Sequence, residues 1–302
     1  MIEFAIQVGY NSHSIISKGQ IILNSKKPLL YLIIASILWS TGGLFIKIID
    51  WNPMAIAGIR SGIAALIMLL YLRHIPSLRS IKPVTILGAL SYSFLVICFV
   101  IANKLTTSAN AILLQYTSPI WVMLFSWLCL KEKIKWKDIA TMFVVFLGMF
   151  LFFADELHPG NMLGNLVAIL SGVFMAAFVI LLKQQKDTPL LYVSLLGNVF
   201  TFLFAIPFYT TSVPDSKTIG GLIFLGVFQL GISYLFYTKA VAHVTLLQAT
   251  LIPILEPLLN PFWVFFVTSE KPGALSILGG CLVVAAVLLH QLFSIPKVSI
   301  PS

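Results

Sequence analysis

The sequence predicts an all-α membrane protein with ten transmembrane helices, built as two inverted five-helix repeats. Three features favour this fold: the composition, a regular succession of apolar runs, and a pattern that occurs twice. Hydrophobic residues make up 59% of the 302 residues and charged residues only 10%, whereas a soluble domain is about 25% charged. So few charges cannot coat a water-soluble fold of this size, and its outer surface must therefore face lipid.

The apolar runs define the expected helices. Each run has about the twenty residues that a helix needs to cross ~30 Å of hydrocarbon. Most prolines outside the runs lie at or near their boundaries, where a helix can end. The expected helices cover residues 29–48, 54–72, 83–102, 106–128 and 138–154 in the first half, and residues 163–182, 189–209, 219–238, 243–267 and 273–293 in the second.

The repeated pattern occupies residues 119–132 and 257–270. Each copy begins with proline, has glutamate as its fourteenth residue, carries an aromatic-rich apolar run between them, and is followed by lysine. The offset of 138 residues also relates Thr107 to Thr245, and a fixed offset over such a distance indicates an internal duplication.

The duplication predicts how the chain is divided. Because each copy contains five helices, an odd number, the second copy must cross the membrane in the opposite orientation. We therefore expect repeats at 28–155 and 162–293, with cytoplasmic tails at 1–27 and 294–302. Inverted repeats with a site near the midplane are typical of secondary transporters.

Basic residues predict the orientation, because they favour the cytoplasmic side of a membrane. With the N-terminus in the cytoplasm, the ten helices place fourteen of the nineteen Lys and Arg residues on that side. We expect an integral protein of a bacterial plasma membrane with both termini cytoplasmic. The net charge of +9 follows from this topology, and no clustered basic face for nucleic acid is expected.

These motifs resemble the EamA-type branch of the drug/metabolite transporter superfamily. The matching features are the ending Pro-x12-Glu-Lys of each half, the pair Trp39-Ser40, Arg60, and the pair Glu256-Pro257. The resemblance extends over residues 28–293, with one departure: Gly279 and Gly280 of the last helix correspond to Thr141 and Met142 in the first half. It implies small-metabolite transport through a central cavity, often amino-acid or metabolite export and sometimes uptake.

Glu256 is the sharpest candidate for a functional residue. It lies near the middle of the expected helix 243–267, with apolar residues for a turn on either side. A charge inside a membrane costs roughly 2.5–3.5 kcal/mol on insertion scales, so it usually faces a cavity or a partner. Either Glu256 binds a substrate ammonium group or carries a coupling proton, or it is a neutral or paired group that holds helices together.

Arg60 is the second charge within an expected helix. Gly58 and Gly62 flank it, and small residues four apart let a neighbouring helix come close. Arginine stays ionised, so it needs a counter-charge or a carboxylate ligand. Two interpretations remain open, namely a structural pair, for which Glu256 is one candidate partner, and a clamp on a substrate carboxylate.

Matched polar faces follow the two duplicated helices 106–128 and 243–267. They consist of Thr107, Ala111, Gln115 and Ser118 in the first half and Thr245, Gln248, Glu256 and Asn260 in the second. These spacings keep one face of a helix. Ser118 stands at the position of Glu256, so only one face is charged. We expect Gln115, Ser118, Gln248 and Asn260 to bind substrate together with Glu256.

Aromatic and polar residues near the expected midplane complete the predicted cavity, where rings can contact a cationic or apolar substrate. They are Trp39, Ser40, Tyr92, Tyr116, Gln229 and Tyr234. Helix packing is an equal alternative for each of them.

No motif of an enzyme occurs in the sequence. The five histidines are solitary, the phosphate-binding pattern GxxxxGK is absent, and no nucleophile motif is present. We therefore expect no catalytic activity, no metal and no cofactor.

The sequence thus predicts a secondary active transporter of small metabolites, with amino acids or related compounds as substrates and export favoured over uptake. Its expected partners are the small-molecule substrate, the lipid bilayer and, as a candidate coupling ion, the proton. Two alternatives stay open: an uptake permease for a cationic or nucleoside-like metabolite, and a membrane scaffold or receptor without transport. The oligomeric state does not follow from the sequence.

Overall fold

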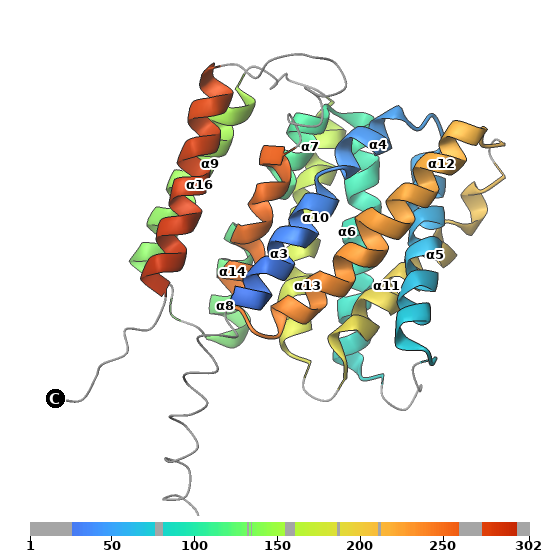
Figure 1. The fold of residues 1–302 in the computed structure, drawn as a ribbon, viewed down its shortest axis with the longest axis horizontal. Coiled ribbons are helices and arrows are strands. Elements are labelled where there is room, and N and C mark those ends of the chain that lie inside the picture. The colour runs from blue at the N-terminus through green and yellow to red at the C-terminus, as the bar shows by residue number, and fades with distance from the viewer. Residues whose placement is uncertain are drawn as a thin grey trace, which may run out of the picture.

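The fold is a bundle of helices that run side by side (Figure 1). The computed structural model describes residues 26–75, 81–131, 133, 135–154, 161–185, 188–210, 213–259 and 274–294, and these contain helices and no strand. The α-helices are α3 (Lys26–Trp39), α4 (Gly42–Ile48), α5 (Pro53–Leu72), α6 (Pro83–Leu105), α7 (Ser108–Gln115), α8 (Ser118–Leu130), α9 (Trp136–Phe153), α10 (Met162–Lys183), α11 (Leu190–Phe204), α12 (Ser216–Phe224), α13 (Ser233–Val241), α14 (Leu246–Leu251) and α16 (Ala274–Ser294). Three other segments are the 3-10 turns η2 (Ile206–Phe208) and η4 (Ile252–Ile254) and the π-helix η3 (Leu225–Ile232).

Much of the described chain is suited to a membrane. Seven of its helical stretches are long and apolar enough to cross one: Lys27–Ile48, Pro53–Leu72, Pro83–Leu105, Ser108–Leu130, Trp136–Phe153, Met162–Lys183 and Ser216–Val241. Three shorter apolar helices cover Leu190–Phe204, Leu246–Leu259 and Ala274–Leu289. The predicted all-helical membrane class is therefore confirmed for these residues.

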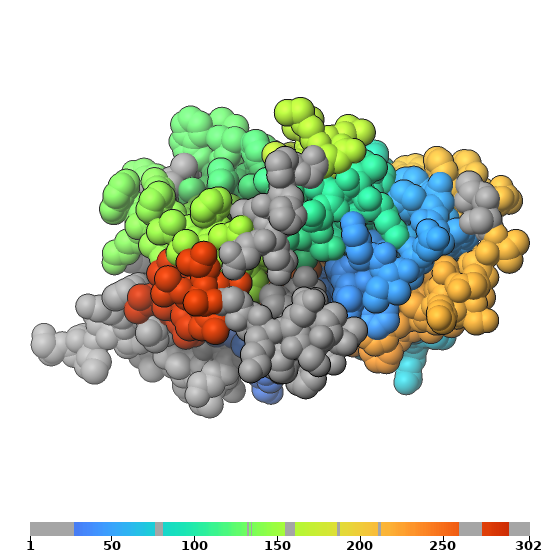
Figure 2. All heavy atoms as spheres, turned by 90° about the horizontal axis from the view of Figure 1, so that it is seen from above, coloured from blue at the N-terminus to red at the C-terminus, as the bar shows by residue number. Residues whose placement is uncertain are grey.

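The bundle is organised around α6, which packs against α5, α10 and α11. Helix α5 also packs on η3, and α3 packs on α13. Helices α9 and α16 form a pair at one end of the long axis, and α12 lies toward the other end (Figures 1 and 2). The pair is close because it meets at glycines: a Cβ at Gly279 would lie 2.4 Å from the carbonyl oxygen of Gly148.

Three helices that the sequence predicts as continuous are broken. The expected helix 29–48 is interrupted between α3 and α4, and the expected helix 106–128 between α7 and α8. In the expected helix 243–267, the turn η4 separates α14 from a helical segment at 255–259. Pro119 and Pro253 lie at two of these breaks, because proline has no N–H to continue the helical hydrogen bonds.

The duplication is visible in the local structure as well as in the sequence. Helices α7 and α14 begin 138 residues apart. Both Thr107 and Thr245 are N-caps whose side chains accept a hydrogen bond from a backbone N–H three residues on. The second cap is a full capping box, because the Gln248 side chain accepts from the Thr245 N–H at 2.9 Å.

Some predictions fall outside the described residues. These are residues 1–25 of the N-terminal tail, residues 295–302 of the C-terminal tail, Asn260, and the glutamates that close the repeated pattern, Glu132 and Glu270. Helix α3 includes Lys26, which lies inside the predicted tail 1–27.

Candidate functional site

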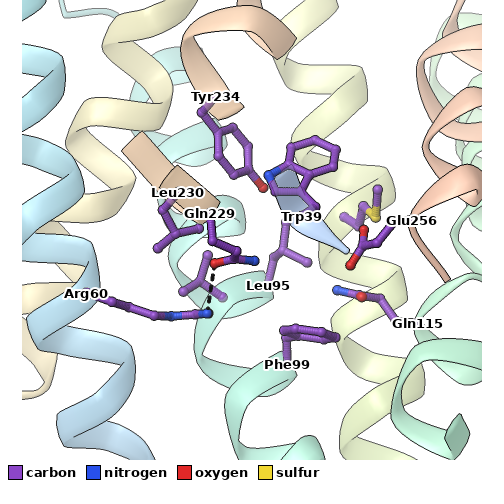
Figure 3. Close-up of a pocket in the computed structure, with 11 residues that line it drawn as sticks. Trp39, Arg60, Leu95, Phe99, Gln115, Gln229, Leu230, Tyr234 and Glu256 are labelled. Carbon is purple, nitrogen blue, oxygen red and sulfur yellow. Dashed lines mark hydrogen bonds between the residues drawn. The ribbon is translucent and has the colours of Figure 1, made fainter. Parts of the chain in front are cut away.

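A small internal cavity lies where both repeats meet. Helices α3, α5, α6, α7 and α10, the π-helix η3, α13 and the segment 255–259 contribute to its walls. Its volume is about 40 Å³, which is room for a few water molecules. The lining residues are Trp39, Arg60, Leu95, Val96, Phe99, Gln115, Met175, Gln229, Leu230, Tyr234 and Glu256 (Figure 3).

Prolines in the broken helix leave two backbone carbonyl groups without their helical N–H donors. Tyrosine hydroxyl groups donate to these carbonyls instead. Because Pro257 has no N–H, the carbonyl of Pro253 lacks its helical donor, and the Tyr116 hydroxyl lies 2.6 Å from that oxygen. Because Pro253 has no N–H either, the carbonyl of Ala249 is left open, and the Tyr237 hydroxyl donates to it at 3.3 Å. The break in this helix is thus held by side chains from elsewhere in the bundle.

Tyr116 also contacts the carboxyl group of Glu256, which is only 8% exposed. The distance from the hydroxyl oxygen to Glu256 Oε2 is 2.6 Å, the same as to the Pro253 carbonyl oxygen. A hydroxyl has one proton to donate, and both a carbonyl and an ionised carboxylate can only accept. Both contacts are full hydrogen bonds at once when Glu256 is protonated and donates to Tyr116.

On the opposite wall, Arg60 is 1% exposed and donates from Nη1 to Gln229 Oε1 at 3.1 Å. The π-helix η3 carries Gln229 toward Arg60, and glycines let η3 approach α5. A Cβ at Gly226 would lie 2.9 Å from the Arg60 carbonyl oxygen. A Cβ at Gly42 would likewise lie 2.8 Å from Gln229 Nε2, so the glycine at the start of α4 leaves room for this amide.

Arg60 has no carboxylate partner among the described residues. Its Nε finds no hydrogen-bond acceptor there, and neither does Nε1 of Trp39, which is 5% exposed. Glu256 and Arg60 lie on opposite sides of the cavity (Figure 3), so the structural pair between them that the sequence left open is not formed.

An aromatic cluster closes the cavity beside Trp39. The Trp39 ring lies 5.0 Å from the rings of both Tyr234 and Tyr237, and Tyr92 meets Tyr234 edge to face at 4.8 Å. Ring pairs at these distances are favourable. They fix the Trp39 ring at the cavity wall.

Two stretches of the chain, residues 26–154 and 162–290, each match the sequence model of the EamA-like transporter family. The chain belongs to this family. EamA-like proteins are membrane transporters and not enzymes, so this chain is an integral membrane transporter with two EamA repeats.

Curated relatives agree with the EamA assignment. An uncharacterized transporter of Archaeoglobus fulgidus is 25% identical over 294 residues, which is 88% of this chain and 98% of the relative. The pseudopaline exporter CntI of Pseudomonas aeruginosa is 27% identical, covering 75% of this chain and 82% of CntI. Human solute carrier family 35 member G1 is 27% identical, with 70% and 64% covered.

A solved crystal structure has a similar fold. It superposes with a TM-score of 0.73 at 19% sequence identity, covering 89% of this chain and 97% of the other. At this identity the likeness concerns the fold alone.

In this EamA chain, the structure brings five of the ten predicted site residues to the cavity. They are Trp39, Arg60, Gln115, Tyr234 and Glu256. Gln115 lies on the same side as Glu256 (Figure 3) and donates from Nε2 to Ser171 Oγ at 3.0 Å.

Four other predicted site residues lie away from the cavity lining among the described residues. Ser118 is fully buried, Ser40 donates to the Ile37 carbonyl, and the Tyr92 hydroxyl accepts from Asn198 Nδ2 at 3.0 Å. Gln248 belongs to the capping box of α14. Asn260 lies outside the described residues.

Sequence reasoning did not name the apolar part of the wall. Leu95, Val96, Phe99, Met175 and Leu230 contribute to it. Nothing distinguishes these residues in the sequence from the many other apolar residues of their helices. Their position depends on how α6, α10 and η3 pack.

Proposed function

We propose that this chain is a secondary active transporter of small amphipathic metabolites, amino acids or related compounds, which it exports in exchange for protons. Its ten helices form two inverted repeats, 28–155 and 162–293, which alternately open the central cavity to either side of the membrane. Both termini lie in the cytoplasm, in a bacterial plasma membrane. Gln115 and Glu256 contact the substrate on one wall of the cavity, and Trp39, Arg60 and Tyr234 complete the site.

Contacts between connections support this topology. Thr85, at the start of α6, donates to Gln185 after α10, and the Lys183 side chain donates to the Val244 carbonyl before α14. All of these segments are expected on the cytoplasmic side. Lys47 donates to the carbonyls of Asn103 and Thr106 at 3.0 Å each, and these residues are expected on the other side.

The packing pattern supports the repeat. Helix α5 packs on η3, and the equivalent helix α11 packs on α6. Helix α3 packs on α13, and the equivalent α10 packs on α6. Each repeat thus packs its first two helices on the third helix of the other, as two halves related by a two-fold axis in the membrane plane would do.

The observation that carries proton exchange is the Tyr116 hydroxyl between two acceptors. Its contacts to the Pro253 carbonyl and to Glu256, both 2.6 Å, are both fully satisfied when the carboxyl group carries a proton. An ammonium group that binds at Glu256 needs the ionised form, so the proton must leave as the substrate arrives. Because Glu256 binds either a proton or the ammonium group of the substrate, but not both, the flux of protons and the flux of substrate run in opposite directions.

Opposed fluxes favour export. Bacterial proton gradients point inward, so a proton that enters drives a substrate outward. A relative with 27% identity is named an exporter, of pseudopaline. Membership of a transporter family favours transport over a scaffold or receptor. Uptake of a cationic or nucleoside-like metabolite remains the alternative, and the direction of the proton flux separates it from export.

The test uses the purified chain in liposomes that contain a pH-sensitive dye, to which each of the twenty common amino acids is added in turn. At least one amino acid should move protons in the opposite direction through the wild type, and Glu256→Gln should reduce this movement to the level of empty liposomes. The control is Asp50→Asn, which removes an exposed carboxylate outside the cavity. Flux in Glu256→Gln equal to the wild type would contradict the proposal.

A further inference from the structure

Arg60 is a buried cation whose charge the described protein leaves unmatched. It is 1% exposed, and its one hydrogen bond to a side chain goes to the neutral amide of Gln229. Its Nε has no acceptor within the described chain. Burying an ion without a counter-charge costs several kcal/mol, so such ions are normally paired.

A second donor without an acceptor lines the same cavity. Nε1 of Trp39 is buried and makes no hydrogen bond in the described chain. The indole nitrogen can only donate, and so can every nitrogen of the guanidinium. Two donors of this kind around one cavity select a ligand group that accepts hydrogen bonds and carries negative charge.

The equivalent position of the second repeat carries no charge. The residue equivalent to Arg60, 138 residues on, is Asn198. Asn198 links α11 to α6 through the Tyr92 hydroxyl at 3.0 Å and donates to the Ser194 carbonyl at 2.9 Å. A neutral side chain therefore links the helices at this position, without the positive charge that Arg60 carries.

We propose that Arg60 and Trp39 bind the carboxylate of a zwitterionic substrate whose ammonium group binds Glu256. This assignment rests on the proposed transport function. Arg60 and Glu256 lie on opposite sides of the cavity (Figure 3), so a ligand that spans it meets a cation at one end and a carboxyl group at the other. Phe99, Met175 and Leu230 also line the cavity and favour an apolar side chain.

The size of the cavity links binding to the transport cycle. About 40 Å³ is far less than the ~300 Å³ or more of a small-molecule site. The two repeats must therefore move apart to admit an amino acid, and the opposite charges on facing walls draw them together again around it. A ligand with only one charged end contacts one wall and leaves the other charge unmatched.

Four probes with one aromatic side chain test this arrangement by direct binding to the full-length chain in lipid nanodiscs. L-phenylalanine carries both charges, its methyl ester and phenethylamine lack the carboxylate, and N-acetyl-L-phenylalanine lacks the ammonium group. Wild type should bind phenylalanine about tenfold or more tightly than the other three, because each loses hydrogen bonds to a charged group.

Variants locate each end of the ligand. Arg60→Gln should bind phenylalanine and its methyl ester equally, and Glu256→Gln should bind phenylalanine and the N-acetyl compound equally. If Arg60→Gln does not fold, Trp39→Phe provides the same test, because it keeps an aromatic ring and removes the N–H. It should weaken phenylalanine binding several-fold and leave methyl ester binding unchanged.

Two results would overturn the assignment: wild type that binds the methyl ester or the amine as tightly as the amino acid, and a folded Arg60→Gln variant that keeps the preference for the amino acid. Proton exchange separates this failure from failure of the proposed function. If phenethylamine drives protons through the wild type and phenylalanine does not, the exchange function stands and the carboxylate site is wrong. If no probe or common amino acid drives protons, the exchange function itself fails.

Discussion

Arg60 and Asn198 occupy equivalent positions in the two repeats. Both connect helices, but their surroundings differ. Each links the second helix of its own repeat to the third helix of the other, Arg60 through Gln229 and Asn198 through Tyr92. Only Arg60 lines the cavity. Both side chains connect the two halves, and Arg60 in addition contributes a charged group to the cavity wall.

The same contrast holds for Ser118 and Glu256. Both are buried, yet the Ser118 hydroxyl has no hydrogen-bond partner in the described chain, whereas Glu256 meets Tyr116 at 2.6 Å. A duplicated scaffold thus places two equivalent positions in different chemical surroundings. The cavity draws its cation from the first repeat and its carboxyl group from the second.

Moving the carboxyl group between the repeats gives the largest expected effect. In the double variant Ser118→Glu with Glu256→Ser, the carboxyl group moves to a position that does not line the cavity. We expect proton exchange in liposomes to fall to background, as in Glu256→Ser alone. Exchange restored above that single variant would mean that the two positions are interchangeable, and the contrast between the repeats would be wrong.

Two equivalent glycines, Gly88 and Gly226, show how closely the third helix of each repeat packs against the other repeat. A Cβ at Gly226 would lie 2.5 Å from Ile63 Cβ and 2.9 Å from the Arg60 carbonyl oxygen, a backbone atom. A Cβ at Gly88 would lie 2.8 Å from Val193 Cγ1 and next meet Leu181 Cβ at 3.5 Å. Gly226→Ala should lower the free energy of unfolding by about 1–3 kcal/mol, as overpacking typically does.

Thermal unfolding in detergent provides this comparison. Gly88→Ala should be the less destabilising of the two, because the tip of a valine side chain can move and a backbone oxygen cannot. An equal loss in both variants would show that η3 is no more tightly held against α5 than α6 is against α11.

The two tyrosines that satisfy proline-freed carbonyls should differ by a smaller amount. Tyr116→Phe leaves the Pro253 carbonyl without a donor and should cost about 1–3 kcal/mol of stability. Tyr237→Phe removes a longer bond, 3.3 Å against 2.6 Å, and should cost less. Only Tyr116→Phe should also slow proton exchange, because Tyr116 alone contacts Glu256. Unfolding and flux are measured on the same preparations, and a flux defect in Tyr237→Phe would contradict this division.

Much of the fold follows from the sequence because its signals are local. Hydrophobic runs predict the helices, and the 138-residue offset relates the N-caps of α7 and α14, Thr107 and Thr245. The polar face predicted for the helix 243–267 was based on an unbroken helix. In the structure, the Gln248 side chain folds back to cap α14, and the 3-10 turn η4 interrupts the regular helical spacing.

The remaining part of the site depends on contacts between distant residues. Nothing in the residues of Leu225–Ile232 favours a π-helix over an α-helix, yet this segment brings Gln229 to Arg60. Tyr116 meets Pro253 across 137 residues of chain, and only tertiary packing places them together. Arg60 and Glu256, and with them Trp39, Gln115, Gln229 and Tyr234, were predictable because charged and polar side chains in apolar helices are rare. The apolar residues of the cavity wall were not.

The protonation of Glu256 is the most direct test of the account. Infrared difference spectra of wild type against Glu256→Gln at pH 7 isolate the absorption of this one carboxyl group. Without an added amino acid, the wild type should show the carbonyl stretch of a neutral carboxylic acid, and phenylalanine should convert it to the bands of an ionised carboxylate. Carboxylate bands already present before phenylalanine is added would contradict the exchange of a proton for substrate at Glu256.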